Sequence, residues 1–189
     1  MHPSRVLILS ERALTELPPL KDVAELHTLD VGHNRLTSVP RLPDISGYLY
    51  LHDNALRSLP DALCDLARLR YLNVSANPIR MLPARIGDMR GLIELRAERC
   101  GLTTLPASIG KLHALHELAL RDNAIAEPPA EIGELPNLRR LDLRNNGLRS
   151  LPASVGELPH LDKLDLRWNP GLETPWLEAL ERRGCVIWR

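Results

Sequence analysis

Residues 138–152 read LRRLDLRNNGLRSLP, which fits the pattern LxxLxLxxNxLxxLP over its whole length. Residues 115–125 and 69–83 repeat this pattern, with isoleucine or valine in place of some leucines. From the second marker onward the pattern recurs every 23 residues, and the first step is 20 residues. Asparagines mark the period, with Cys100 in the single gap between them: Asn34, Asn54, Asn77, Asn123, Asn146 and Asn169.

Each unit is predicted to contain one short strand. In its xLxLx segment the leucines point to one face of the strand and the alternating residues to the other. Stacked units pair these strands into a parallel sheet with a spacing of about 4.8 Å. The rest of each unit, which contains Pro and Gly, forms the crossover as short turns or helical pieces. One unit cannot bury its leucines alone, so neighbours must stack. The sequence predicts an α/β solenoid, a horseshoe arc with a parallel concave sheet of about eight strands.

The last residues break the repeat. We predict that residues 1–170 form the solenoid and residues 171–189 a C-terminal cap, a helix plus a short strand, within one domain. Thr174 is predicted to cap this helix, Pro175 to begin it and Gly184 to end it. The tryptophans of this segment are interpreted as packing residues of the cap: Trp176 and Trp188.

A second signature, LPxxIGxL, lies between the strands. This 23-residue unit resembles the intracellular leucine-rich-repeat class of Ras-suppressor and Scribble-type scaffolds, which has many bacterial members. The shortened unit over residues 36–51 resembles the 20-residue repeats of secreted bacterial effectors. The resemblance covers nearly the whole chain and implies protein binding by the concave face. The signature is centred on four dipeptides: Ile86-Gly87, Ile109-Gly110, Ile132-Gly133 and Val155-Gly156.

The concave face is predicted to carry the binding residues. All three tyrosines of the chain, Tyr48, Tyr50 and Tyr71, fall on this face on two adjacent strands. Tyrosine is favoured at protein interfaces, although it also suits strands in general. Because no predicted core position holds a tyrosine, we interpret the cluster as a partner-binding surface. His52, Arg96 and Arg99 occupy concave positions as well and complete the candidate set.

A column of arginines, one per unit, continues this face. Arg121, Arg144 and Arg167 hold the same strand position. Two interpretations are open: a ladder of solvated ion pairs with neighbouring aspartates, or a docking strip for an acidic segment. The acidic residues on the same strands nearly balance the basic ones, which favours the ladder. Trp168, at the end of this face, is a candidate anchor if the cap leaves it exposed.

Four further residues of the concave face have side chains that bind metals: Asp30, His33, His52 and Asp53. No ligand-spacing motif supports a metal site, so solvent-facing polar residues are the favoured interpretation. We expect neither a metal nor a cofactor.

Catalysis is not expected. The sequence contains no phosphate-binding loop, dinucleotide fingerprint, serine-hydrolase elbow or zinc-protease motif. Three widely spaced cysteines do not form a disulfide framework. The repeats and the cap use nearly every residue, which leaves no room for a catalytic domain.

The predicted partner is another protein. The chain has 24 basic and 24 acidic residues, so its net charge of zero makes a polyanion or nucleic-acid partner the weaker alternative. Residues 6–9 form an apolar edge strand that would allow a homodimer. This run is too short for a signal peptide or a membrane span, so a cytoplasmic protein without membrane association is expected.

Overall fold

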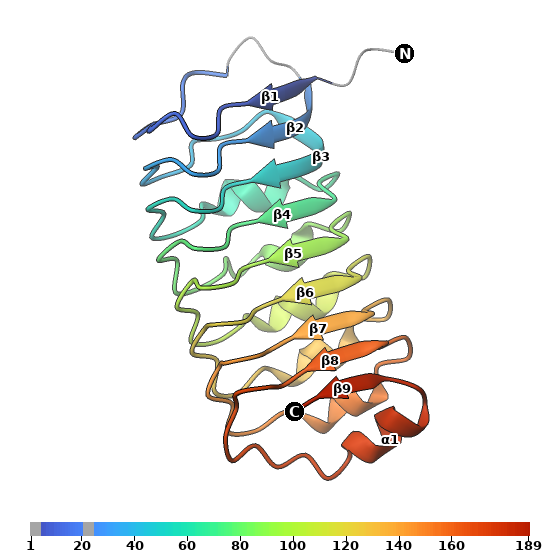
Figure 1. The fold of residues 1–189 in the computed structure, drawn as a ribbon. Coiled ribbons are helices and arrows are strands. Elements are labelled where there is room, and N and C mark those ends of the chain that lie inside the picture. Colours follow the sequence, from blue (N-terminus) through green and yellow to red (C-terminus); the bar gives the residue numbers. More distant parts are fainter. Residues whose placement is uncertain (1–4, 21–24) are drawn as a thin grey trace.

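A computed structural model describes residues 5–20 and 25–189; the first four residues of the predicted solenoid lie outside this range. The chain forms one sheet of nine parallel strands stacked in sequence order, from β1 to β9 (Figure 1). The strands are β1 (Val6–Ile8), β2 (Glu25–Asp30), β3 (Asp44–Tyr50), β4 (Tyr71–Asn73), β5 (Glu94–Arg96), β6 (Glu117–Ala119), β7 (Arg140–Asp142), β8 (Lys163–Asp165) and β9 (Val186–Trp188).

The core is built from aliphatic side chains that stack in register. The central leucine of each strand lies opposite that of the next, as in Leu72 with Leu95 and Leu95 with Leu118. These three side chains are fully buried. Burying one such side chain stabilises the fold by about 1.5–3 kcal/mol. The repeated leucines therefore form one continuous core, as the pattern predicts.

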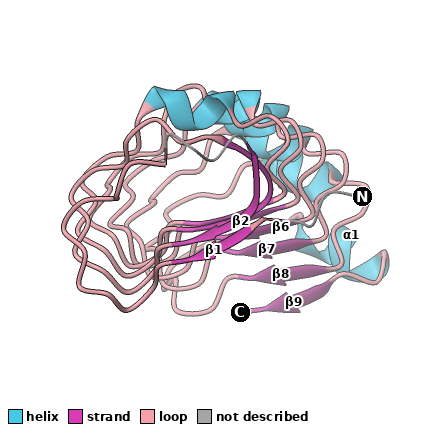
Figure 2. Cartoon of the chain, turned by 90° about the horizontal axis from the view of Figure 1, so that it is seen from above, coloured by secondary structure: helices cyan, strands magenta, loops and turns pink. Residues whose placement is uncertain are grey.

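Short 3-10 helices form the crossovers on the opposite side from the strands (Figure 2). Glycine in the IG signature allows these helices to stack closely, because a Cβ on Gly110 would lie 2.5 Å from the carbonyl oxygen of Glu131 in the next turn. The helical segments are η1 (Asp61–Asp65), η2 (Ile86–Asp88), η3 (Ala107–Lys111), η4 (Ala130–Glu134) and η5 (Ala153–Glu157).

The marker asparagines form a ladder of hydrogen bonds at the end of the strands. Asn77 donates from Nδ2 to the carbonyl oxygens of Leu51 and Val74, both at 2.9 Å, and its Oδ1 accepts the amide of Leu56 at 3.0 Å. At the gap, the Cys100 thiol reaches the carbonyl oxygen of Val74 at 3.4 Å. The residue before each marker, and Glu11 before Arg12 in the first turn, adopt a left-handed backbone with φ of 51–59°: Glu11, His33, Asp53, Ala76, Arg99, Asp122, Asn145 and Trp168.

The first turns differ from the uniform short strands of the repeat. Strands β2 and β3 have six and seven residues, and their pairing contains a bulge between Leu26 and Thr28. In the 20-residue unit, β3 follows Pro43 directly and no helical piece precedes it. The unit is shorter because extended chain replaces the 3-10 helix.

The final helix begins later than predicted. Helix α1 (Leu177–Arg182) packs against η5, and Gly184 adopts φ +91° after its end. The side chain of Thr174 makes no capping bond; its carbonyl oxygen instead accepts the amide of Leu177 at 3.1 Å. A tight turn therefore occupies positions 175–176, and the prediction of a helix starting at Pro175 is wrong. Strand β9 follows the helix and becomes the ninth strand of the sheet.

Candidate functional site

The three tyrosines meet on the concave face of the sheet. Register places Tyr48 opposite Tyr71, with Tyr50 two residues further along β3. The rings of Tyr50 and Tyr71 are 4.9 Å apart, those of Tyr48 and Tyr71 5.8 Å, and Tyr48 stacks on Tyr50 at 6.5 Å. The structure thus brings the predicted tyrosine cluster into one continuous surface.

Histidines extend this cluster on both sides. The ring of His27 lies 5.5 Å from Tyr48, that of His52 lies 6.1 Å from Tyr50, and His33 lies 4.7 Å from His52. We call these three tyrosines and three histidines the aromatic patch. It spans strands β2 to β4 and the turns that follow β2 and β3.

Two glycines make room for the imidazoles. A Cβ on Gly32 would lie 2.5 Å from the ring of His52, and one on Gly47 would lie 2.6 Å from the ring of His27. His27 was not among the predicted residues, because it belongs to the bulge and not to the regular concave positions. Gly47, in the interior of a strand, was the available signal for such a close approach.

Three side chains of the aromatic patch, Tyr50, His52 and Tyr71, have shifted pKa values. Burial raises the pKa of Tyr71 to about 12, and burial together with neighbouring Tyr48 raises the pKa of Tyr50. Burial and the adjacent His33 lower the pKa of His52, so its imidazole is neutral at pH 7. Tyr48 remains 42% exposed. The patch therefore offers neutral ring surface and hydroxyl groups to a partner.

Apolar side chains continue this surface to the first edge of the sheet. Val6 and Ile8 on β1 are 55% and 58% exposed, and they lie opposite Thr28 and Asp30 of β2. This is the edge proposed for a homodimer; among the described strands, β1 pairs only with β2. An edge strand of this kind is open to pairing with another chain.

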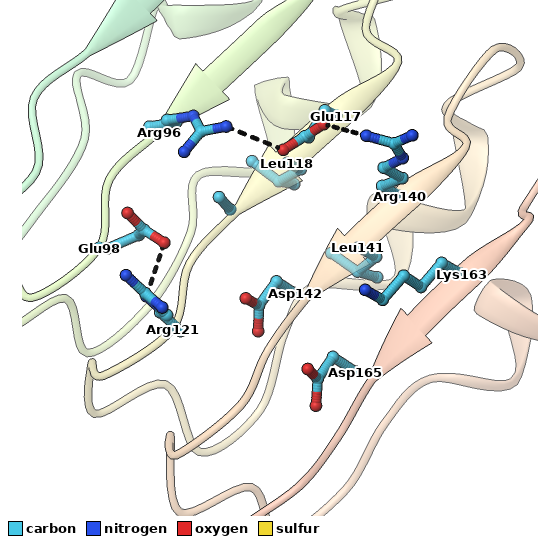
Figure 3. Close-up of a pocket in the computed structure, with 11 residues that line it drawn as sticks. Arg96, Glu98, Glu117, Leu118, Arg121, Arg140, Leu141, Asp142, Lys163 and Asp165 are labelled. Carbon is cyan, nitrogen blue, oxygen red and sulfur yellow. Dashed lines mark hydrogen bonds and ion pairs between the residues drawn. The ribbon is translucent and has the colours of Figure 1, made fainter. Parts of the chain in front are cut away.

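The second half of the concave face is occupied by ion pairs, which we call the charged strip. Arg121 Nε lies 2.7 Å from Glu98 Oε1, and Glu117 lies between Arg96 and Arg140 at 3.3 Å from each (Figure 3). Arg96 also contacts Glu94 at 2.5 Å. The arginines of this region therefore have acidic partners close by.

The other two arginines of the column, Arg144 and Arg167, also have carboxylates nearby. Arg167 bonds to Asp165 at 2.6 Å, and Arg144 lies 3.7 Å from Asp142. Arg121 forms an ion pair with Glu98 and lies 3.9 Å from its sequence neighbour Asp122. A hollow in this half has Ala119 among its lining residues, a short side chain between the charged ones of β5 and β7. Predicted candidate Arg99 lies apart from the strip, exposed at a left-handed corner.

Tryptophans frame the C-terminal end of the face. Trp168 is 66% exposed, so the C-terminal cap does not cover it. The guanidinium of Arg144 lies 5.4 Å from its ring centre. Trp188 lies on the concave side of β9, 39% exposed, beneath the ammonium of Lys163 at 3.6 Å. Its interpretation as a packing residue of the cap is wrong, because β9 joins the sheet and turns this residue outward. Trp176 packs near Gly156.

The three cysteines of the chain lie in its interior. All three thiols are buried and free. Burial raises the pKa of Cys64 and of Cys100 to about 11, so neither is a nucleophilic thiolate at neutral pH.

Of the four potential metal ligands, three side chains come together: His33, His52 and Asp53. Within the part of the chain that the structure describes, no helix is long and apolar enough to cross a membrane.

Comparison with known proteins identifies the repeats. Residues 4–121 match a profile described as leucine-rich repeat region, and residues 113–170 match a leucine rich repeat profile. A leucine-rich-repeat protein from Leptospira interrogans superposes with a TM-score of 0.87 at 31% identity, covering 97% of this chain and 48% of that one. The chain therefore spans about half the length of that protein.

The leucine-rich repeat domain of the type III effector XopL gives a TM-score of 0.71 at 24% identity, covering 97% of this chain and 75% of that one. A similarity at this identity shows the fold alone. No curated protein matches the sequence.

Proposed function

Because the chain belongs to the leucine-rich-repeat family, we propose that it is a non-catalytic module that binds a protein partner through the aromatic patch. The observation that carries this proposal is the gathering of all three tyrosines of the protein on one neutral, partly exposed surface. Tyrosine is enriched among the residues that dominate binding energy at interfaces. A ring fixed by its neighbours also loses little conformational freedom on binding.

The surface is suited to a partner of ordinary interface size. A standard interface covers about 800 Å² on each partner, which three tyrosines alone do not supply. The exposed Val6 and Ile8 extend the same face beyond the patch. The proposed footprint therefore runs from β1 to β4, with the tyrosines at its centre.

The charged strip does not favour the alternative of a polyanion or nucleic-acid partner. Binding a phosphate would require Arg121 or Arg167 to exchange a carboxylate already at 2.6–2.7 Å for the new anion. The acidic groups left behind would then repel the phosphate. A protein partner remains the better fit to the whole face.

The finer assignments rest on the sequence. We propose that the repeats belong to the 23-residue intracellular class, with a bacterial source and a cytoplasmic location, because the LPxxIGxL signature resembles that class. Both an adaptor within the cell and an effector acting in another cell are compatible with such a module.

The experiment is a pull-down from source-cell and candidate-host lysates with mass-spectrometric identification of the captured proteins. Wild type is compared with a Tyr48→Ala/Tyr50→Ala/Tyr71→Ala variant. The matched control replaces three exposed side chains outside the sheet: Arg57→Ala, Met81→Ala and Arg149→Ala. A protein captured by wild type and control but lost from the folded tyrosine variant supports the proposal. Equal capture by all three contradicts it.

A salt titration of the captured complex separates the two classes of partner. Binding through the aromatic patch should change little between 50 and 200 mM salt, whereas contacts to several phosphates would weaken binding by orders of magnitude over roughly that range. A steep loss of affinity with rising salt would indicate that the partner binds the charged strip.

A further inference from the structure

We propose that His33, His52 and Asp53 form a binding site for a divalent transition-metal ion of the zinc, nickel or copper class, at the edge of the aromatic patch. The three ligand atoms all lie within 4.8 Å of one another. They come from two consecutive turns, and their backbones are bonded together: the amide of His33 donates to the carbonyl oxygen of His52 at 3.0 Å.

The spacing is close to what a metal requires. His33 Nδ1 and Asp53 Oδ2 are 3.6 Å apart. Two ligands of a tetrahedral zinc ion with bonds of about 2.1 Å are separated by about 3.4 Å. The widest separation must shorten by at most about 1.4 Å, which small rotations of the side chains can supply.

One ligand has an unmet bonding requirement. His52 Nδ1 is buried and has no hydrogen-bond partner among the described residues. An unpaired buried nitrogen costs free energy, and a metal ion would satisfy it.

The surroundings are suited to a cation. Asp30 lies close enough to act electrostatically on His52, and its Oδ1 accepts the amide of Gly32 at 2.9 Å. Gly32 leaves the space in which the imidazole lies, since a Cβ there would overlap it. Among the described residues, His33 is the one basic side chain within ion-pairing distance of Asp53.

The repeat explains why no ligand-spacing motif announces this site. In zinc fingers, neighbouring ligands are a few residues apart on one turn or hairpin. In a solenoid, ligands from adjacent turns are one repeat apart, and here His33 and Asp53 are separated by the 20 residues of the shortened unit. The absence of a local motif therefore does not argue against the site.

The ligand set selects the kind of metal. Imidazole nitrogens suit zinc, nickel and copper, while magnesium and calcium prefer oxygen ligands alone. Three protein ligands leave at least one coordination position for water or for a group of a partner. Metal binding here does not depend on the proposed protein partner.

The test is a titration of the whole chain with zinc by calorimetry and with cobalt(II) by visible absorption. We expect one ion per chain, and zinc binding weakened by about 10–100-fold or more in His33→Ala/His52→Ala. Asp53→Asn should also bind weakly; asparagine is tolerated at this left-handed corner, so this variant keeps the fold. His160→Ala, which removes an exposed histidine in another turn, should bind like wild type.

Three outcomes overturn the proposal: no binding at stoichiometric zinc, equal binding by the double-histidine variant, or competition by magnesium at comparable concentration. A thiolate-to-cobalt absorption band would also overturn it, because the ligands would then be the cysteines.

Discussion

The aromatic patch over β2 to β4 and the charged strip over β5 to β8 use the same strand positions of one sheet, yet they expose opposite chemistries. Tyr71 lies opposite Glu94 in the register, so the change occurs between two adjacent strands. In the strip, each arginine has a carboxylate nearby, as Arg121 has Glu98. In the patch, rings contact rings and keep exposed edges and hydroxyl groups. The scaffold is uniform, and the difference lies in the side chains: the strip pairs its charges within itself, whereas the patch presents aromatic rings.

The largest expected effect is on partner affinity. The triple tyrosine variant should bind the identified partner about 100-fold or more weakly, because single interface tyrosines can contribute 2 kcal/mol or more. The variant Arg121→Gln/Arg144→Gln/Arg167→Gln should lose less than about tenfold, since these arginines lie outside the proposed footprint over β1 to β4 and are already paired with carboxylates. Biolayer interferometry with the purified partner gives both values. The reverse order of the two losses would mean that the strip is the binding surface.

A smaller effect is expected on the packing of the patch. Gly32→Ala should lower the free energy of unfolding by about 1–2 kcal/mol, because the new Cβ displaces the ring of His52. Urea denaturation followed by circular dichroism measures the loss. In a Gly32→Ala/His52→Ala double variant the two losses should not add, since the ring is absent. Additive losses would show that His52 does not need the space above Gly32.

A third prediction concerns the stability of the turn at Cys100, the one repeat without a marker asparagine between Asn77 and Asn123. Cys100→Asn should raise the free energy of unfolding by about 0.5–1.5 kcal/mol, because an asparagine amide bonds the neighbouring turns where the thiol makes only weak contacts. Asn123 shows the arrangement, with its Oδ1 accepting the amides of Cys100 and Leu102. The midpoint of urea unfolding gives the change. A lower midpoint would mean that this turn is shaped to hold sulfur.

The smallest effect on stability is expected in the strip. Glu98→Gln should cost less than about 1 kcal/mol, because Arg121 is partly exposed and solvent screens the pair. Removal of the carboxylate should nevertheless lengthen retention on a heparin column, since Arg121 is then free to meet an anion. Glu127→Gln, an exposed acid outside the sheet, provides the control for the change in net charge. Equal retention of the two variants would show that ion pairing does not mask the arginines.

Repeat chemistry made most of the fold predictable, because the asparagine period fixes where each strand lies and which way its leucines point. The same register correctly brought Tyr48 and Tyr71 together. His27 was missed because its place depends on a bulge, which one strand alone does not encode. Trp188 was misplaced because its orientation follows from pairing with β8, a contact between segments that share no repeat pattern. Whether these residues bind a partner depends on a second molecule, which this sequence does not describe.

Among the described residues, each strand pairs only with its sequence neighbours, so unfolding can proceed along the stack turn by turn. Opening from the first end separates β1 from β2 and leaves the rest of the stack intact, so the terminal turns should exchange their amide hydrogens before the middle ones. The aromatic patch begins one strand in from that end. A partner bound across β1 to β4 would therefore oppose this opening. Amide hydrogens should then exchange more slowly, even in turns that the partner does not contact.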